Sequence, residues 1–293
     1  MLHALRTRDQ QKSGAATVLV DKHIFAPTLA VMQTRAVPQG IHLSVGCWKD
    51  FEFTPDVFAI VLQYPNANGQ AEDYRELVEK AHAAGVKVAV AADILSLALL
   101  TPPGEWGADI VFGSTQRLGT PLFYGGPSAA YFATREEYKR NMPGRIIGWS
   151  LDKYGKRCFR MALQTREQHI KREKATSNIC SNESLMALWV TVYLSLMGPE
   201  GLREVNRISC DGAHYLKDAL LATGQFEDPF PGKPFLKEFV LKPKKFPGLM
   251  QKRLEEAGYF AALDTEEGYV SFCVTEQRTK EEIDGLVQIV KEG

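Results

Sequence analysis

Short apolar runs alternate with amphipathic segments through the first two thirds of this chain. The apolar runs have the length of β-strands, and the segments between them carry apolar residues at helical spacing. This order is typical of parallel strands that are joined by crossover helices. The pattern predicts strands at Thr17–Val20, Ile41–Val45, Ala59–Gln63, Lys87–Ala91, Ile110–Phe112 and Ala129–Ala133.

The clearest crossover helix is predicted at Glu72–Ala84. It begins with acidic residues, has apolar or small residues at helical spacing, and ends at Gly85. Together with the strands on either side it predicts a β-α-β unit, and the second strand of that unit ends at Asp93.

The pattern changes after Ser150. A turn is predicted around Asp152–Lys156, followed by a long polar stretch, Gln164–Cys180. Two helices are then expected, broken apart by Gly198, Pro199 and Gly201. The remaining elements alternate as in a small α+β unit: helices Glu183–Met197 and Gly201–Ala222, strand Glu238–Lys242, helix Pro247–Ala257, strand Tyr269–Val274 and helix Lys280–Lys291.

These patterns predict a large α/β domain with a mostly parallel sheet at residues 1–183, connecting helices at 184–224, and a small α+β domain at 225–293. A chain of 293 residues is long enough for two packed units, because single cores stop growing at about 250 to 300 residues. Neither an internal repeat nor a low-complexity segment is evident in the sequence.

Composition narrows the class of protein. Lys+Arg and Asp+Glu each number 35, so the formal net charge is zero and a polyanion partner such as nucleic acid is not indicated. The sequence offers no apolar run of bilayer length, and its first residues carry charges where a signal peptide has its apolar core. The five cysteines are scattered, odd in number and never spaced C-x-x-C. We therefore expect a cytoplasmic protein with reduced thiols, no metal site and no membrane partner.

Asp93 is the first candidate for chemistry. It ends the apolar run V-K-V-A-V-A-A-D, at the carboxyl edge of the predicted sheet, where folds of this class place ligands. A carboxylate there can pair with the ring nitrogen of a pyridine cofactor and keep that nitrogen protonated. From its position alone, Asp93 is at least as well suited to capping the segment that follows.

A second candidate is the polar, glycine-rich loop Gly113–Pro127, which follows a buried strand. In enzymes built on pyridoxal phosphate, such a loop carries the lysine that forms the Schiff base. Here Gln116 and Arg117 occupy the corresponding place, and a guanidinium that stays protonated cannot condense with an aldehyde. Composition alone also fits an ordinary solvated loop.

The polar stretch Gln164–Cys180 is a third candidate. Its mixed charges at helical spacing favour a solvated helical face with local ion pairs. His169 fits a surface or interface position as well as an acid–base role. The polar group Thr176, Ser177 and Asn178 fits either a helix cap, which we favour, or a contact with a ligand.

Several ordered motifs closely resemble the decarboxylating glycine dehydrogenase family, the P-protein of the glycine cleavage system. The likeness extends from Ala4 to Lys291, and so many motifs in the right succession make a chance match improbable. The motifs are P-P-G-E-W-G-A-D-I, G-S-T-Q-R-L-G-T-P, Y-G-G-P, M-P-G-R-I-I-G and L-Q-T-R-E-Q-H-I-K-R-E-K-A-T-S-N-I-C.

The resemblance is to the N-terminal half of that enzyme, or to its first subunit where the halves are separate chains. It implies the aminotransferase-like fold type I and pyridoxal phosphate held mainly by the other half, which carries the lysine. The implied reaction is decarboxylation of glycine with transfer of the aminomethyl group to the lipoyl arm of the H-protein. The implied partners are that lysine-bearing half, the lipoylated H-protein and glycine, and this chain alone is expected to be inactive.

The resemblance also implies places for individual residues. Asp93 takes the place of the residue at the cofactor ring nitrogen, and Arg117 takes the place of the Schiff-base lysine. Gln116, Arg117, His169, Thr176, Ser177 and Asn178 are expected to form a wall at the substrate or at the interface. No catalytic residue is expected in this chain.

The start of the chain is expected to be shortened relative to the family. Domains of this kind begin with a helix whose N-terminus holds the cofactor phosphate, whereas Leu2–Gln10 resembles the tail of that helix. Two alternatives stay open: a self-sufficient pyridoxal-phosphate enzyme, and a non-catalytic scaffold or regulatory partner of a lysine-bearing enzyme.

Overall fold

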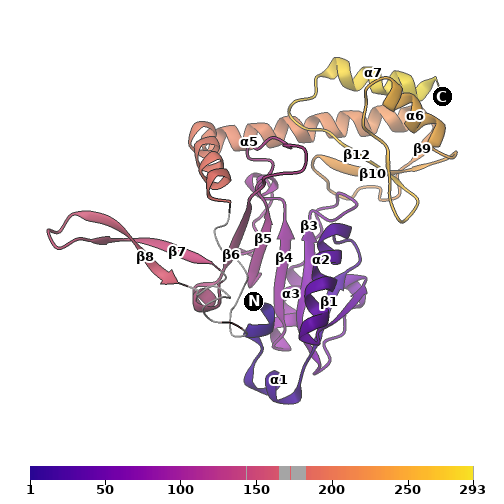
Figure 1. Cartoon of the computed structure of the whole chain (residues 1–293). Helices are drawn as coiled ribbons and strands as arrows, with labels where there is room; N and C mark the ends of the chain where they lie inside the picture. Colours follow the sequence, from indigo (N-terminus) through magenta and orange to yellow (C-terminus); the bar gives the residue numbers. More distant parts are fainter. Residues whose placement is uncertain (143, 165–171, 173–182, 293) are drawn as a thin grey trace.

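The computed structural model describes residues 1–142, 144–164, 172 and 183–292, which form a large sheet, a small sheet and a projecting ribbon (Figure 1). The large sheet has the order β2-β1-β3-β4-β5-β6. Its strands are β1 (Thr17–Asp21), β2 (His42–Gly46), β3 (Val57–Tyr64), β4 (Lys87–Ala92), β5 (Ile110–Ser114) and β6 (Ala130–Thr134). Each predicted strand is present within a few residues of its expected place.

The sheet is mostly parallel, as predicted, and its last strand is the exception. The pairs β1–β2, β1–β3, β3–β4 and β4–β5 are parallel, whereas β6 runs antiparallel to β5, with Ile110 opposite Thr134. No crossover helix lies between Ser114 and Ala130, where all residues are described. Without such a connection the chain returns along the neighbouring edge in the opposite direction.

Helix α3 (Arg75–Ala83) covers one face of the sheet. Leu77, Val78 and Ala81 are buried with apolar side chains of β3 and β4, such as Ile60 and Val88. These helix residues are spaced so that they share one side of the helix, which is the pattern that predicted it. The helix is shorter than expected, because it starts at Arg75 and not at Glu72.

The opposite face of the sheet packs against α2 (Ala26–Ala36) and the first residues of the chain. The pattern did not predict α2, whose only buried residue is Ala36. The single helix expected at Leu2–Gln10 is two short pieces, the 3₁₀ turn η1 (Leu2–Leu5) and α1 (Arg8–Ser13). They are separate because Thr7 forms a capping box with Gln10 and starts a new helix.

Strands β7 (Arg145–Leu151) and β8 (Arg157–Gln164) form an antiparallel ribbon that extends away from the body (Figure 1). The predicted turn at Asp152–Lys156 closes it, since Asp152 Oδ1 accepts the backbone N–H groups of Tyr154 and Lys156. The sequence analysis predicted this turn without its strands.

Helix α5 (Ser184–Ala222) connects the two sheets and changes direction at Gly198, between the two predicted helices. Gly198 has φ 60° and ψ −178°, a backbone region that is essentially restricted to glycine. By length and apolar composition, α5 qualifies as a candidate membrane span, which the sequence analysis did not expect. Length and composition are weak evidence, and the break at Gly198 interrupts the rod.

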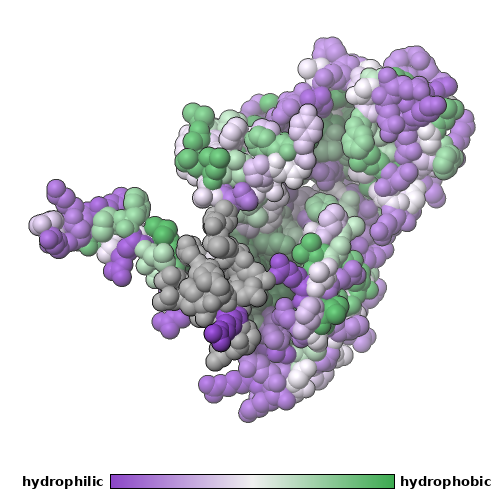
Figure 2. Space-filling model, viewed as in Figure 1, coloured by the Kyte–Doolittle hydropathy of each residue, from purple (hydrophilic) through white to green (hydrophobic). Residues whose placement is uncertain are grey.

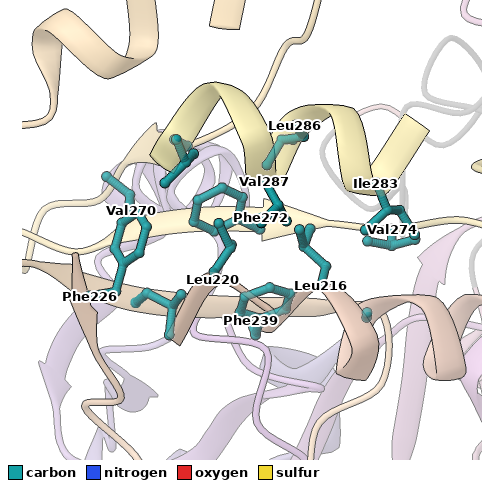
Figure 3. Packing of buried hydrophobic residues seen from close by; sticks show 14 of the residues in the cluster. Leu216, Leu220, Phe226, Phe239, Val270, Phe272, Val274, Ile283, Leu286 and Val287 are labelled. Atoms are coloured by element: carbon teal, nitrogen blue, oxygen red, sulfur yellow. The ribbon is translucent and has the colours of Figure 1, made fainter. Parts of the chain in front are cut away.

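The C-terminal unit contains a small antiparallel sheet of order β11-β12-β10-β9. Residues of α5, α7, β10 and β12, including Leu220, Phe239, Phe272 and Leu286, pack together in its core (Figure 3). Its elements are β9 (Phe226–Glu227), β10 (Glu238–Pro243), α6 (Gly248–Glu256), β11 (Leu263–Asp264), β12 (Val270–Cys273) and α7 (Lys280–Lys291). The domain limits given above stay predictions.

Several contacts join this unit to the part of the chain that forms the large sheet. Gln70 forms an isolated antiparallel bridge with Phe235, and a Cβ atom at Gly69, whose φ is +83°, would lie 2.0 Å from the carbonyl oxygen of Glu238. Elsewhere Glu267 accepts hydrogen bonds from Lys22 and Asn68 at 3.0 and 3.1 Å and contacts His23 at 3.2 Å. The small unit is therefore fixed on the sheet at separate places.

Candidate functional site

The carboxyl ends of β4 and β5 place the first two candidates side by side. These strands are parallel neighbours, with Ala91 opposite Phe112, so the chain leaves both at the same edge of the sheet. Asp93 directly follows β4, and the loop with Gln116 and Arg117 follows β5. The family resemblance implied that Asp93 and this loop share one site, and the parallel pairing of β4 and β5 explains why they are neighbours.

Asp93 and Arg117 form a half-buried ion pair. Arg117 Nη1 donates to Asp93 Oδ2 at 2.6 Å, and the two side chains are 19% and 18% exposed. Asp93 Oδ1 accepts the backbone N–H of Leu95 at 3.2 Å, at the first residue of the turn η4 (Leu95–Ala98), whose N-cap position is Ile94. The Asp93 side chain thus bonds to the segment that follows it without occupying the N-cap position, and its place at a cofactor ring stays a prediction.

Lys237 adds a second cation from the small unit. Its Nζ atom lies 3.7 Å from Asp93 Oδ2 and 2.5 Å from Glu238 Oε1, and its side chain is 16% exposed. Burial alone would lower the pKa of Lys237, but the negative charges of Glu238 and Asp93 outweigh it and raise the pKa above its ordinary value. Lys237 is therefore held as an ammonium ion.

Gln116 and α5 fix the loop that carries Arg117. Gln116 Nε2 donates to the carbonyl oxygens of Thr120 and Pro121 at 2.7 and 2.9 Å, which closes the loop on itself. Trp189 of α5 donates from Nε1 to the carbonyl oxygen of Gly119 at 2.7 Å. Leu118 is buried with Val190 of the same helix. Arg117 consequently projects from a loop that is held at both ends.

A cavity of about 1360 Å³ opens above the sheet face that lies opposite α3. Its floor consists largely of apolar side chains such as Val18, Phe58 and Phe112. Five polar lining residues, Asp93, Gln116, Arg117, Lys237 and Glu238, stand together at the carboxyl edge of the sheet. Others, such as His3 and Arg35, line the cavity from the chain start and α2. This arrangement, apolar with a few convergent charges, is typical of a ligand site.

The described residues do not fit pyridoxal phosphate bound covalently in this cavity. Lys237 is the only lysine among the described lining residues, and its ammonium group is engaged by Glu238. The carboxylate that would pair with the ring nitrogen already accepts the Arg117 guanidinium. A cofactor ring would have to compete with a charge-assisted hydrogen bond for Asp93.

The structure tests the remaining site candidates unequally. Asp93, Gln116 and Arg117 all line the cavity. His169, Thr176, Ser177 and Asn178 lie outside the described residues. Sequence reasoning missed Lys237 and Glu238, because a Lys-Glu pair at the start of a strand resembles any solvated strand end. Only tertiary packing brings Lys237 to Asp93.

The comparisons with known proteins agree on one family. The model of the glycine cleavage system P-protein matches residues 3–290. The chain belongs to this family. Glycine dehydrogenase (decarboxylating) of Bacteroides fragilis is 71% identical over 205 residues, which is 70% of this chain and 22% of that protein. For the enzyme of Flavobacterium johnsoniae the identity is 52% over 227 residues, 78% of this chain and 24% of that protein.

This P-protein family member thus spans less than a quarter of the length of these curated relatives. Among solved structures, an inhibitor-bound glycine decarboxylase (P-protein) of the glycine cleavage system superposes with a TM-score of 0.88 at 37% identity, covering 97% of this chain and 67% of that one. A sphingosine-1-phosphate lyase of Burkholderia pseudomallei has a TM-score of 0.70 at 14% identity, covering 99% and 66%. The fold is therefore fold type I, as predicted.

Proposed function

We propose that this chain is the lysine-free half of a glycine decarboxylase and works only when paired with a lysine-bearing half. Family membership supports the reaction class. The paired half would hold pyridoxal phosphate, and the complex would decarboxylate glycine and pass the aminomethyl group to the lipoyl arm of the H-protein. The cofactor supplies the electron sink for such chemistry, and the protein supplies position and charge.

The observation that carries this proposal is the Arg117–Asp93 ion pair. Arg117 stands where the resemblance places the Schiff-base lysine, and its 2.6 Å contact occupies the carboxylate expected at the ring nitrogen. A guanidinium has no deprotonated form at workable pH, so it cannot act as the amine nucleophile. A half that holds both groups in one ion pair has to obtain the Schiff base from a partner.

We assign the partner surface first to the β7–β8 ribbon. Ile147, Trp149 and Leu151 alternate along β7, and Phe159 and Met161 stand opposite Trp149 and Ile147 on β8. These five side chains are 41% to 77% exposed. Single exposed apolar residues are ordinary, but a contiguous face of large side chains indicates an interaction site.

The positive charge of the ribbon favours a partner whose binding surface has acidic residues at its edge. Residues 145–164 contain five basic residues and one acidic residue, a net charge of +4 in a chain whose total is zero. The Arg157 guanidinium lies 5.2 Å from the centre of the Trp149 ring, so a cation stands beside the apolar face. We expect the lysine-bearing half to present an apolar groove with acidic edges to this ribbon.

The start of α5 also carries exposed apolar residues. Leu185, Leu188, Val192 and Leu196 recur at helical spacing and are 50% to 80% exposed. Figure 2 shows apolar residues on the ribbon and at this end of α5. Leu122 and Tyr124 add exposed apolar area from the neighbouring loop, which contacts α5 through Phe123 and Trp189. We assign these residues to the same interface with the lysine-bearing half.

Covalent trapping tests the first part of the proposal. The purified chain is mixed with pyridoxal phosphate, reduced with borohydride and weighed intact and after proteolysis. We expect no stoichiometric label in residues 113–127, because no amine nucleophile stands there. Stoichiometric labelling of that loop would reject the proposal in favour of a self-sufficient enzyme.

Reconstitution tests the second part. The chain is co-expressed with a lysine-bearing half, and glycine–bicarbonate exchange is measured for Arg117→Ala and Asn178→Ala. We expect both variants to lower exchange, since the resemblance assigns both residues to the wall of the site. Unchanged exchange with normal complex formation would leave this chain the role of a scaffold.

Substitutions on the ribbon test the assigned surface. Trp149→Ser together with Phe159→Ser should leave the stability of the isolated chain within about 0.5 kcal/mol, because both side chains are exposed. The affinity for the lysine-bearing half should fall at least tenfold, since buried aromatic anchors dominate interfaces. Lys156→Ser on the ribbon tip is the matched control and should change affinity far less. If the wild type, the double variant and Lys156→Ser bound the lysine-bearing half equally well, the ribbon would not be part of the interface.

A further inference from the structure

We propose that Arg117 and Lys237 form an internal cationic plug, which fills the acidic end of the cavity with the chain's own side chains and fastens the small unit to the sheet edge. The proposal concerns this chain by itself and goes beyond the pairing proposed above. It assigns two cations of the protein to the place where a bound ligand is expected in such a cavity.

The two cations of the plug and their two carboxylate partners, Asp93 and Glu238, compensate one another. Arg117 Nη1 lies 2.6 Å from Asp93 Oδ2, Lys237 Nζ lies 3.7 Å from the same oxygen, and Lys237 Nζ lies 2.5 Å from Glu238 Oε1. Two cations and two carboxylates therefore form one chain of contacts with no net charge. A half-buried group of this kind is stable only when its charges are paired.

The plug leaves little of Asp93 for an external cation. Both carboxylate oxygens are engaged, Oδ2 by the two cations and Oδ1 by the N–H of Leu95. Tyr131 also lines the cavity and donates from its hydroxyl to the carbonyl oxygen of Ala92, the residue before Asp93, at 2.9 Å. Burial, with the charge of Asp93, raises the pKa of Tyr131, so it stays a neutral donor.

The contacts of the plug come from distant parts of the chain. Asp93 and Arg117 follow two strands of the large sheet, and Lys237 and Glu238 stand at the start of β10 in the small sheet. The plug therefore adds an ionic link beside the backbone bridge between Gln70 and Phe235. Loss of one member leaves an uncompensated charge at a domain junction.

Arg117 is open to replacement by a free cation. Its Nη2 atom is buried and has no hydrogen-bond partner among the described residues, so within that part of the chain one ion pair holds the guanidinium. Truncation of the side chain would leave a guanidinium-sized space beside the Asp93 carboxylate, bordering a cavity of about 1360 Å³. A small guanidinium ion has the charge and the planar donors to fill it.

A double-mutant cycle tests the ion pair by thermal unfolding. Asp93→Asn and Arg117→Gln should each lower the Tm by about 5 to 10 °C, and the double variant should lose little more than either single variant. The matched control is the exposed pair of Asp73 and Arg75, whose contact is 2.5 Å but whose side chains are 59% and 71% exposed. Its cycle should show almost no coupling. Additive losses at Asp93 and Arg117 would overturn the proposal.

Chemical rescue is a second test of the plug that does not depend on the Asp93→Asn and Arg117→Gln variants. Ethylguanidinium at millimolar concentration should raise the Tm of Arg117→Ala by several degrees and leave the wild type and the Arg75→Ala control unchanged. The wild type should also show no rise in Tm with about 1 mM pyridoxal phosphate, because Asp93 and Lys237 are already engaged in ion pairs. Equal responses of Arg117→Ala and Arg75→Ala, or stabilisation of the wild type by the cofactor, would overturn the proposal.

Discussion

The small C-terminal unit and the large sheet enclose their apolar residues differently. In the small unit, α5 and α7 pack with β10 and β12 into one core, where Leu220, Val270 and Val290 are fully buried. The large sheet is covered by α3 on one face, whereas its other face packs against α2 and the first residues of the chain and also borders the cavity. The small unit therefore buries its apolar residues in a closed core, whereas one face of the large sheet leaves space for a ligand.

This difference in packing indicates which region can hold a ligand. A closed core contributes stability and has no room for a ligand, whereas an apolar floor with charges at one edge can accommodate one. In this chain the charged edge is occupied by its own Arg117 and Lys237. This face therefore has the cavity of a cofactor site, but the chain's own Arg117 and Lys237 neutralise the Asp93 carboxylate at its edge.

The largest expected effect contrasts the two regions directly. Phe272→Ala in the small core should lower the free energy of unfolding by about 3 to 5 kcal/mol, because it leaves a void that the packed neighbours cannot fill. Phe112→Ala, on the floor of the cavity, should cost less than half as much, because Phe112 already borders open space. Urea unfolding measures both values. Similar losses would show that the two regions are packed alike.

A smaller effect is expected where the two regions touch. Gly69→Ala would place a Cβ atom 2.0 Å from the carbonyl oxygen of Glu238, so the junction has to shift, at a cost of about 2 to 3 kcal/mol. Gly40→Ala is the matched control, since Gly40 also has a positive φ, +62°, but nothing lies within 4 Å of the added atom. It should cost only the backbone term, about 1 kcal/mol. Equal costs in urea unfolding would show that the contact at Gly69 is not tight.

The smallest effect concerns the Glu267 contacts that also join the two regions. Burial would raise the pKa of Glu267, but hydrogen bonds from Lys22, Asn68 and His23 outweigh it and lower the pKa. A carboxylate with a lowered pKa in the folded state adds stability above its unfolded pKa of about 4.3 and loses it as the pH falls. Below about pH 5 the stability of the wild type should therefore fall more steeply than that of Glu267→Gln. Parallel slopes in acid titrations followed by urea unfolding would contradict this.

Local patterns predicted the strands and helices well, because each apolar run in β1, β3 and β4 is buried on both faces and reads as a strand without reference to the rest of the chain. The ribbon was harder. Its apolar residues face outward, so nothing in their pattern distinguishes strand β7 from a loop. Helix α2 escaped prediction for a related reason, since Ala36 alone is buried along it.

The candidate site was predictable in part. Asp93 and Arg117 follow neighbouring apolar runs, and the parallel order of β4 and β5 brings them together. Lys237 lies far along the chain, and its contact with Asp93 depends on how the small unit sits on the sheet edge. Contacts of that kind arise from tertiary packing, which local periodicity does not record.

Gly198 determines how far apart the two ends of helix α5 lie. As an unbroken rod, the 39 residues of α5 would measure about 58 Å. The bend folds that length back, so that Trp189 meets Gly119 while Leu220 enters the distant small core. One residue without a side chain thus allows a single helix to support the Arg117 loop with its first half and the small core with its second half.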